Sequence, residues 1–249
     1  MDTRRIITHV RGALVIGALG MVTVLGGCGG AGGGAAATTP TEAAATAAAA
    51  VHTRLAEALA EVNPRLSRQI TAATSDLNEV SVPGMLQGWE VFEIVRIDNP
   101  HIPTSIVAID GADRAVVLSG HPERFATLTE GGVQVDTPEA ALDLVGFFLR
   151  TTRDTSRLVY PIATVDDLRW PTRLNADQTS IKEDAIARLR EQIASPSTTE
   201  TSSGWTITSW TGDQDTVVRH ETTVSKDGAV TDAATTIAEG LPLQRALGG

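Results

Sequence analysis

The chain has 249 residues, 42% of them hydrophobic, and carries 30 acidic against 20 basic side chains, a formal charge of −10 at pH 7. This acidity argues against a nucleic-acid-binding surface, because neutralising phosphates requires clustered Lys and Arg. The single Cys excludes a disulfide framework and an all-cysteine metal site, and the length indicates one large domain or two small ones.

The N-terminus has the pattern of an export signal. Arg4, Arg5 and Arg11 precede residues 12–27, an apolar stretch without charge. This stretch is short for a permanent membrane span, which needs about 20 apolar residues. A positive segment before a short apolar one predicts a secretory signal peptide over residues 1–27.

The apolar stretch ends in Leu25-Gly26-Gly27-Cys28. These residues resemble the lipobox of bacterial lipoproteins, in which an aliphatic residue and two small residues precede a Cys. The resemblance implies that Leu25, Gly26 and Gly27 are recognised by a signal peptidase. It further implies that Cys28 receives diacylglycerol and becomes the mature N-terminus, with an uncleaved N-terminal anchor as the alternative. The likeness covers residues 1–28 alone.

A diacylglyceryl group at Cys28 would hold the protein at the membrane, since two acyl chains give durable attachment and one gives only marginal attachment. Losing residues 1–27 removes three Arg and one Asp, so the mature chain becomes more acidic. Anionic headgroups repel such a chain, and the lipid must do the anchoring. We therefore expect a protein on the extracytoplasmic face of the cell membrane.

Residues 28–50 comprise the lipidated Cys and a low-complexity tether. Gly, Ala and Thr dominate this segment, so no apolar face exists to bury, and the composition predicts a flexible linker. The Ala-rich second half is also compatible with a helix that extends the following helix backward.

An apolar helical stripe follows the tether. Its residues recur at spacings of three and four, and they are Leu55, Leu59, Val62, Leu66 and Ile70. Pro64 interrupts the stripe, because Pro lacks a backbone donor and disfavours a helical residue before it. We expect two helical pieces, with Asn63 as the N-cap of the second, packed on the protein's own sheet.

A first β-rich region opens at Gly88-Trp89. The predicted strands are 89–97, 105–110 and 115–119. Between the last two, Asp110-Gly111 is a hairpin signal, because Gly tolerates positive φ. Together with the preceding helices, these strands form a first predicted unit, residues 51–136.

A second predicted unit covers residues 137–239. Its first helix begins at Thr137-Pro138, with Thr137 as the N-cap. Ser180 and Glu183 have the spacing of a capping box and predict the start of another helix. The predicted strands are 160–165, 205–211, 216–225 and 229–234, with a polar loop at 197–203 and a loose tail at 240–249.

This order of elements predicts an α+β fold with helices packed on antiparallel sheet. Gly88-Trp89 recurs as Gly204-Trp205, and Asp110-Gly111 recurs as Asp227-Gly228. Two copies of a helix-plus-meander unit would explain the recurrence, and so would chance, since both dipeptides are common. The architecture resembles cystatin-like and PepSY-like modules of the cell envelope. Whether the two units form one domain stays open.

Motifs that carry chemistry are missing from the sequence: it has no nucleophile elbow, phosphate loop, dinucleotide fingerprint or His-Glu-x-x-His. We therefore predict no catalytic residue, cofactor or metal site. The weak ligand-site candidates are His121 with Glu123, which could form an acid–base pair, and the aromatic side chains Trp89 and Trp205. A loop histidine and core tryptophans are the simpler interpretations. Residues 213–215 (Asp-Gln-Asp) are predicted to form a polar hairpin turn rather than a cation site.

The expected function is that of a membrane-anchored extracytoplasmic lipoprotein acting as a non-catalytic binding module. Its partner would be an envelope protein, a lipid or a wall component, and no nucleic acid. The alternative is an envelope hydrolase, which would be favoured by a pocket that gathers His121 or His220 with two carboxylates, one of perturbed pKa. A closed core with an apolar groove would favour binding, and a wide apolar cavity would favour a lipid carrier.

Overall fold

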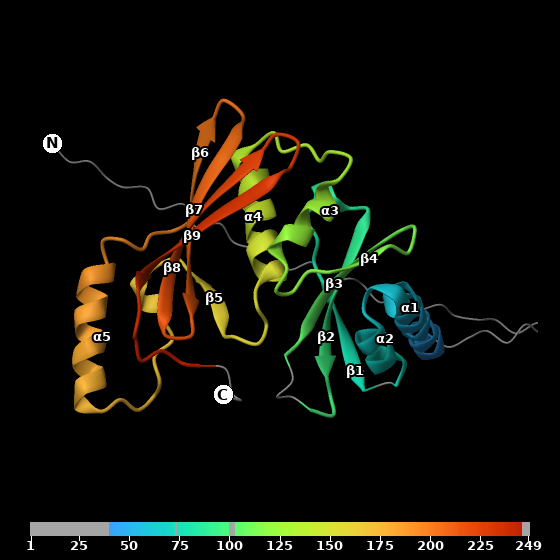
Figure 1. The fold of residues 1–249 in the computed structure, drawn as a ribbon, viewed down its shortest axis with the longest axis horizontal. Coiled ribbons are helices and arrows are strands. Elements are labelled where there is room, and N and C mark those ends of the chain that lie inside the picture. Colours follow the sequence, from blue (N-terminus) through green and yellow to red (C-terminus); the bar gives the residue numbers. More distant parts are fainter. Residues whose placement is uncertain (1–39, 73, 100–102, 246–249) are drawn as a thin grey trace, which may run out of the picture. The chain divides into compact units, whose positions relative to one another are not determined.

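The computed structural model describes residues 40–72, 74–99 and 103–245 (Figure 1). The predicted signal peptide lies outside these residues, together with Leu25, Gly26, Gly27 and Cys28. Within the described part of the chain, no helix combines the length and the hydropathy that a membrane span requires. The fold is α+β with two antiparallel sheets, as predicted.

Two helices open the described chain, α1 (Pro40–Val62) and α2 (Pro64–Thr71). The break between them is the predicted one, because the Asn63 side chain accepts a hydrogen bond from the Leu66 N–H at 3.1 Å and Pro64 is the first helical residue. Since α1 begins at Pro40, the Ala-rich part of the predicted tether is helical, which was the second of the two alternatives.

The first sheet (sheet A) is an antiparallel meander in chain order. Its strands are β1 (Ser75–Val80), β2 (Trp89–Arg96), β3 (Ser105–Asp110) and β4 (Ala115–Val117), with the short helix η1 (Gly84–Leu86) between β1 and β2. Helices α1 and α2 cover one face through a core that contains Leu55, Leu59, Phe92 and Val107 (Figure 1). Strand β1 was not predicted, because only Ser75 of its six residues is buried and no apolar alternation marks it.

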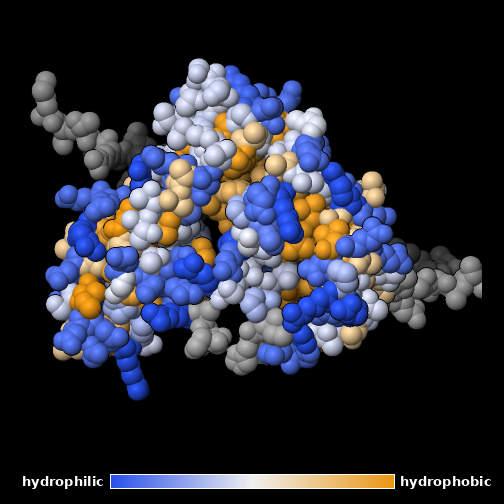
Figure 2. Space-filling view, viewed as in Figure 1, coloured by the Kyte–Doolittle hydropathy of each residue, from blue (hydrophilic) through white to orange (hydrophobic). Residues whose placement is uncertain are grey.

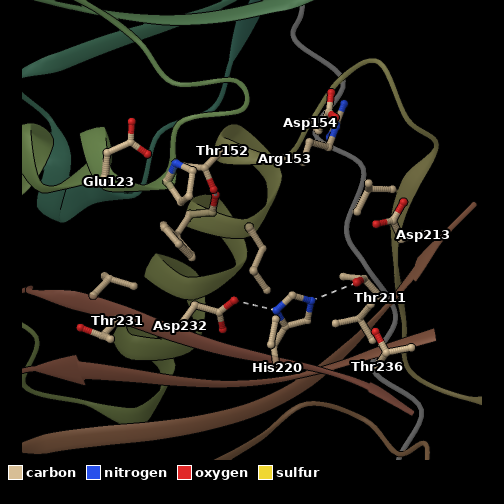
Figure 3. A pocket seen from close by; sticks show the side chains of 17 residues that line it. Glu123, Thr152, Arg153, Asp154, Thr211, Asp213, His220, Thr231, Asp232 and Thr236 are labelled. Carbon is tan, nitrogen blue, oxygen red and sulfur yellow. Dashed lines mark hydrogen bonds and ion pairs between the residues drawn. The ribbon is translucent and has the colours of Figure 1, made fainter. Parts of the chain in front are cut away.

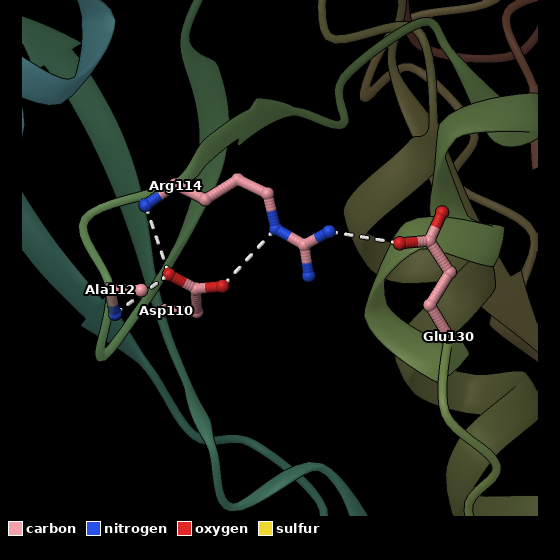
Figure 4. A network of polar contacts seen from close by, with 4 residues as sticks. All are labelled: Asp110, Ala112, Arg114 and Glu130. Atoms are coloured by element: carbon pink, nitrogen blue, oxygen red, sulfur yellow. Dashed lines mark hydrogen bonds and ion pairs between the residues drawn. The ribbon is translucent and has the colours of Figure 1, made fainter.

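The turn between β3 and β4 differs in detail from its prediction. The residue with positive φ is Asp113, at 61°, and not Gly111. Asp110 holds the turn closed: its Oδ1 accepts from the N–H groups of Ala112 and Arg114 at 3.0 and 2.9 Å (Figure 4). The Arg114 guanidinium then joins Asp110 to Glu130 beyond the sheet, at 3.1 and 2.9 Å.

Helix α4 (Pro138–Thr152) lies in the middle of the chain. It is preceded by the short helices η2 (Pro122–Phe125) and α3 (Ala126–Thr129). Strand β5 (Val159–Ile162) and the short helix η3 (Val165–Asp167) follow it. The predicted start of α4 is confirmed, since the Thr137 side chain accepts from the Ala140 N–H at 3.1 Å. Buried α4 residues such as Leu144 and Phe148 belong to a core with Ala108 of sheet A and Ile207 of the second sheet, so the two predicted units share one core.

Helix α5 (Ala176–Leu189) starts four residues before its predicted capping box. The functioning box is Asn175 with Gln178: Asn175 accepts from the Gln178 N–H at 2.8 Å, and the Gln178 side chain accepts from the Asn175 N–H at 3.0 Å. The prediction from Ser180 and Glu183 was wrong, because the same spacing occurs twice and only the first pair stands at the end of the helix.

The second sheet (sheet B) is again antiparallel. Its strands are β5, β6 (Ser197–Thr201), β7 (Gly204–Asp213), β8 (Thr216–Ser225) and β9 (Val230–Ala238). Strand β7 pairs with β6 and then β5 along one edge and with β8 along the other, and β8 pairs with β9. The predicted loop at 197–203 is therefore largely a strand, which its exposed Ser and Thr residues concealed.

The predicted loose tail is packed as far as Leu243. Leu241 and Leu243 are buried in the core beneath α5, and the Leu241 N–H donates to the Asp215 carbonyl at 2.9 Å. The same hydrogen bond holds the β7–β8 turn, which contains the predicted Asp-Gln-Asp segment and has Gln214 at a φ of 53°. Residues 246–249 lie outside the described residues.

The recurring dipeptides occupy matching places in the two sheets. Gly88-Trp89 and Gly204-Trp205 open the strands β2 and β7, while Asp110-Gly111 and Asp227-Gly228 follow β3 and β8. Each set follows a helix and lies in a four-strand meander, β1–β4 or β6–β9. The helix-plus-meander topology thus occurs twice.

Hydrophilic residues dominate the face drawn in Figure 2, and hydrophobic residues gather there in separate patches. Among the described residues, the large hydrophobic side chains that remain exposed are Val62, Ile97, Leu142 and Ile181. Leu142, on α4, borders a cavity.

Candidate functional site

A cavity of about 530 Å³ lies between the C-terminal half of α4 and strands β7, β8 and β9 of sheet B (Figure 3). Helix α4 contributes an apolar wall with Phe148 and Leu149, and η2 contributes Glu123 at the rim. Strands β7, β8 and β9 contribute the floor, whose polar members are Thr211, Asp213, His220, Thr231, Asp232 and Thr236. We call this cavity the sheet B pocket.

The pocket floor is polar because the side chains on one face of β7 change from apolar to polar along the strand. Alternate residues of a strand share a face. Trp205 and Ile207 begin this face and pack in the shared core with α4. Ser209, Thr211 and Asp213 continue it, so apolar packing gives way to hydroxyl and carboxyl groups where the pocket opens.

A chain of hydrogen bonds crosses three strands of the pocket floor. His220 Nε2 lies 2.9 Å from Thr211 Oγ1, and His220 Nδ1 lies 2.8 Å from Asp232 Oδ2 (Figure 3). Asp232 also accepts from the Thr222 hydroxyl at 2.7 Å. With the carboxylate ionised, a neutral imidazole carries its proton on Nδ1 and accepts the Thr211 hydroxyl proton at Nε2.

The carboxylate of Asp232 is held in its ionised form by these partners. Burial raises its pKa, but the hydrogen bonds from His220 and Thr222 outweigh burial, and the pKa is lowered overall. The His220 and Asp232 side chains are only 11% and 16% exposed, so the pair is well shielded from water.

Asp213 is a second carboxylate of the pocket, and its pKa is raised, whereas that of Asp232 is lowered. Burial raises its pKa; the Arg157 guanidinium, 2.9 Å from Oδ2, opposes this, while Asp154 and Asp215 add to it. Its other oxygen, Oδ1, is buried and has no hydrogen-bond partner. A buried carboxylate oxygen without a donor is costly, and a ligand with an N–H or O–H group would satisfy it.

The predicted pair His121 and Glu123 stands at the rim. His121 Nδ1 lies 3.1 Å from Glu123 Oε1, and both side chains are exposed. Glu123 lines the pocket and His121 does not. The pKa of Glu123 is lowered, first by its own backbone N–H and then by His121.

Trp89 and Trp205 lie outside the pocket. Trp205 is buried in the shared core and its Nε1 donates to the Val135 carbonyl at 3.2 Å. Trp89 is half-buried against the same core, with the Arg114 guanidinium 5.1 Å from its ring centroid. Trp205 is thus a core side chain, and Trp89 packs at the edge of the same core.

The sequence did not single out Thr211, Asp213 and Asp232 as a site, and it named His220 only within the hydrolase alternative. One signal was present: polar residues at every second position of β7 on the face that Trp205 opens. The pairing register that brings His220 between Thr211 and Asp232 comes from the folded sheet and has no local motif.

Among the described residues, no group of three or more His, Cys, Asp and Glu is arranged to hold a metal ion. Comparison with family models, curated proteins and solved structures gives no match. The likeness to cystatin-like and PepSY-like modules therefore stays a prediction. The sheet B pocket is thus a partly enclosed cavity with an acidic lining and one apolar wall.

Proposed function

We propose that this protein is a membrane-anchored extracytoplasmic lipoprotein that binds a small ligand in the sheet B pocket without transforming it. The supporting observation is the pocket itself, about 530 Å³ with converging polar groups on an apolar wall. Ligand sites of proteins have this size and this mixture of linings. The lipoprotein part of the proposal rests on Leu25-Gly26-Gly27-Cys28 in the sequence.

A hydrolase is the second candidate, because Thr211, His220 and Asp232 have the order of nucleophile, base and orienting acid. Acyl transfer also needs N–H donors aimed at the developing oxyanion. Thr211 stands inside β7, between Pro161 of β5 and Val218 of β8. Backbone N–H groups there point along the sheet toward neighbouring strands rather than into the pocket, so binding is the better-supported function.

Bound ligand is sought by native mass spectrometry of the full-length protein, purified gently from membranes. We expect an additional mass on the unaltered protein. Ala234→Trp, opposite His220 on the pocket floor, should remove it, because the indole would occupy the floor beside His220 and clash with the ligand. Ala233→Trp on the other face of β9 is the matched control and should keep it. Equal occupancy in both variants would contradict the proposal.

The hydrolase candidate is tested with p-nitrophenyl acetate. A binding protein should release no burst of nitrophenol and carry no acetyl group on Thr211. An acetylated Thr211 that disappears in His220→Ala would replace the binding proposal with the catalytic one.

A further inference from the structure

A second cavity adjoins the sheet B pocket on the other side of Leu149. It measures about 270 Å³ and lies between α4 and the β5 edge of β7. Its apolar lining includes Leu142, Val145, Leu149, Pro161, Ile162 and Ile207. We call this cavity the apolar slot. Leu149, Arg153, Val159 and Thr211 line both cavities, so the slot and the pocket share one wall.

Two side chains that line the slot, Trp210 and Ser209, carry a buried polar atom without a hydrogen-bond partner, Nε1 and Oγ respectively. Ser209 is 7% exposed. It lines the slot among apolar side chains. The rest of the slot lining is mostly apolar, so the slot favours the apolar part of a ligand.

The pocket end carries an excess of negative charge. Four carboxylates line it, those of Glu123, Asp154, Asp213 and Asp232, against the guanidinium of Arg153. Arg153 is itself engaged outside the pocket: Nη2 lies 3.6 Å from Glu93, and Nη1 donates to the Arg150 carbonyl. Asp213 is paired with Arg157 through Oδ2, and its buried Oδ1 has no hydrogen-bond partner, so a cationic donor that reached this oxygen would satisfy it.

One face of β7 extends from the slot to the pocket. It carries the side chains of Ser209, Thr211 and Asp213. Ser209 lines the slot, Asp213 lines the pocket and Thr211 lines both. Four residues of a strand span about 13 Å. A ligand lying along β7 would therefore place its two ends in environments of opposite character.

We infer that the ligand is an amphipathic cation, with an ammonium or guanidinium group at Asp213 and an apolar chain in the slot beside Ser209. This inference rests on the proposed binding function and specifies the class of its ligand. A carboxylate or phosphate head would meet the four acidic side chains and be repelled, while a hydrophilic cation without a chain would leave the slot empty.

The test is calorimetric titration of the full-length protein with decylamine, decanoate and decanol, each below its micelle concentration. Decylamine should bind about tenfold tighter than decanoate, as expected for one charge-assisted hydrogen bond. Asp213→Asn should weaken decylamine about tenfold and leave decanol unchanged. Asp215→Asn, in the same turn but outside the pocket lining, is the control and should bind decylamine like the unaltered protein.

A second variant tests the slot. Gly146 borders it, and a Cβ there would meet nothing within 4 Å, so Gly146→Phe can plug the slot without disturbing α4. It should weaken both decylamine and decanol, whereas Glu139→Phe, at the exposed start of α4, should weaken neither.

Decanoate binding as tightly as decylamine, no binding of any of the three probes, or no effect of Asp213→Asn would overturn the inference. Loss of the native ligand in Ala234→Trp but not in Ala233→Trp would still support the proposed function. The two failures are therefore distinguishable.

Discussion

His220 Nδ1 lies 2.8 Å from Asp232 Oδ2, and this contact joins the adjacent strands β8 and β9 in the floor of the sheet B pocket. Both side chains are largely buried, and Asp232 also accepts from Thr222, which is fully buried. The contact is accordingly both part of the candidate site and part of the fold.

Removing the carboxylate of Asp232 should destabilise the protein. Asp232→Ala leaves the buried donors of His220 and Thr222 without an acceptor, at a cost of about 2–4 kcal/mol in the free energy of unfolding. Chemical denaturation measures this cost. The control is Glu221→Ala, which breaks only the exposed ion pair with Arg219 and should cost less than about 1 kcal/mol. Similar losses in both variants would mean that the network contributes nothing beyond a surface contact.

Asp213→Asn should make the protein more stable at neutral pH. Burial raises the pKa of Asp213, so its ionised form is less favourable in the folded protein than in the unfolded chain. Its stabilising contribution is present below the unfolded pKa, near 3.9, and is lost as the pH rises through the folded pKa. Thermal unfolding at pH 7 should therefore show a higher Tm for Asp213→Asn, and the difference should vanish below about pH 4.

The same substitution separates binding from folding. Asp213→Asn is expected to bind decylamine more weakly although it folds more stably, a combination that damage to the fold cannot produce. A lower Tm at pH 7 would show that the ion pair of Asp213 with Arg157 outweighs the burial of the carboxylate.

The two Gly-Trp dipeptides should respond differently to substitution. Gly204 has a φ of 154°, and a Cβ there would collide with the Val224 carbonyl and lie 2.8 Å from Ser225 Cα. Gly88 has open space within 4 Å of its Cβ position. Gly204→Ala should lower the free energy of unfolding by about 2 kcal/mol or more, and Gly88→Ala should change it by less than about 0.5 kcal/mol. Urea denaturation of both variants compares them directly, and equal effects would contradict the difference in backbone geometry.

Membrane attachment should depend on Cys28. Cys28→Ala removes the thiol that the lipobox resemblance assigns to diacylglycerol, so the protein should no longer partition into the detergent phase. Mass spectrometry of the unaltered protein should find an N-terminal acylated Cys28. An unaltered protein that begins at Met1 and carries no lipid would remove the membrane anchor from the proposal.

Short sequence motifs predicted helix starts and strands correctly where the residues involved act within a single turn or strand. Asn63-Pro64 and Thr137-Pro138 begin helices as expected, because capping oxygens and Pro act within a single turn. Strand β8 was predicted with its observed bounds, since β-branched residues make up most of it and a turn lies at each end.

Elements without an apolar pattern escaped prediction. Strands β1 and β6 are exposed and polar, and only their pairing with β2 and β7 makes them strands. The same physical reason hid the site. Thr211, His220 and Asp232 are far apart in sequence and meet through sheet register, which depends on how whole strands pair and on no short motif.

The position of Pro40 limits how far the start of the folded body can lie from the membrane. Helix α1 begins there, so a lipid at Cys28, as proposed, is joined to the folded body by the segment 28–40. Even fully extended, that segment reaches only about 40 Å, roughly the thickness of one bilayer. A protein on so short a tether would encounter molecules that leave or enter its own membrane. It would not carry them to a distant membrane.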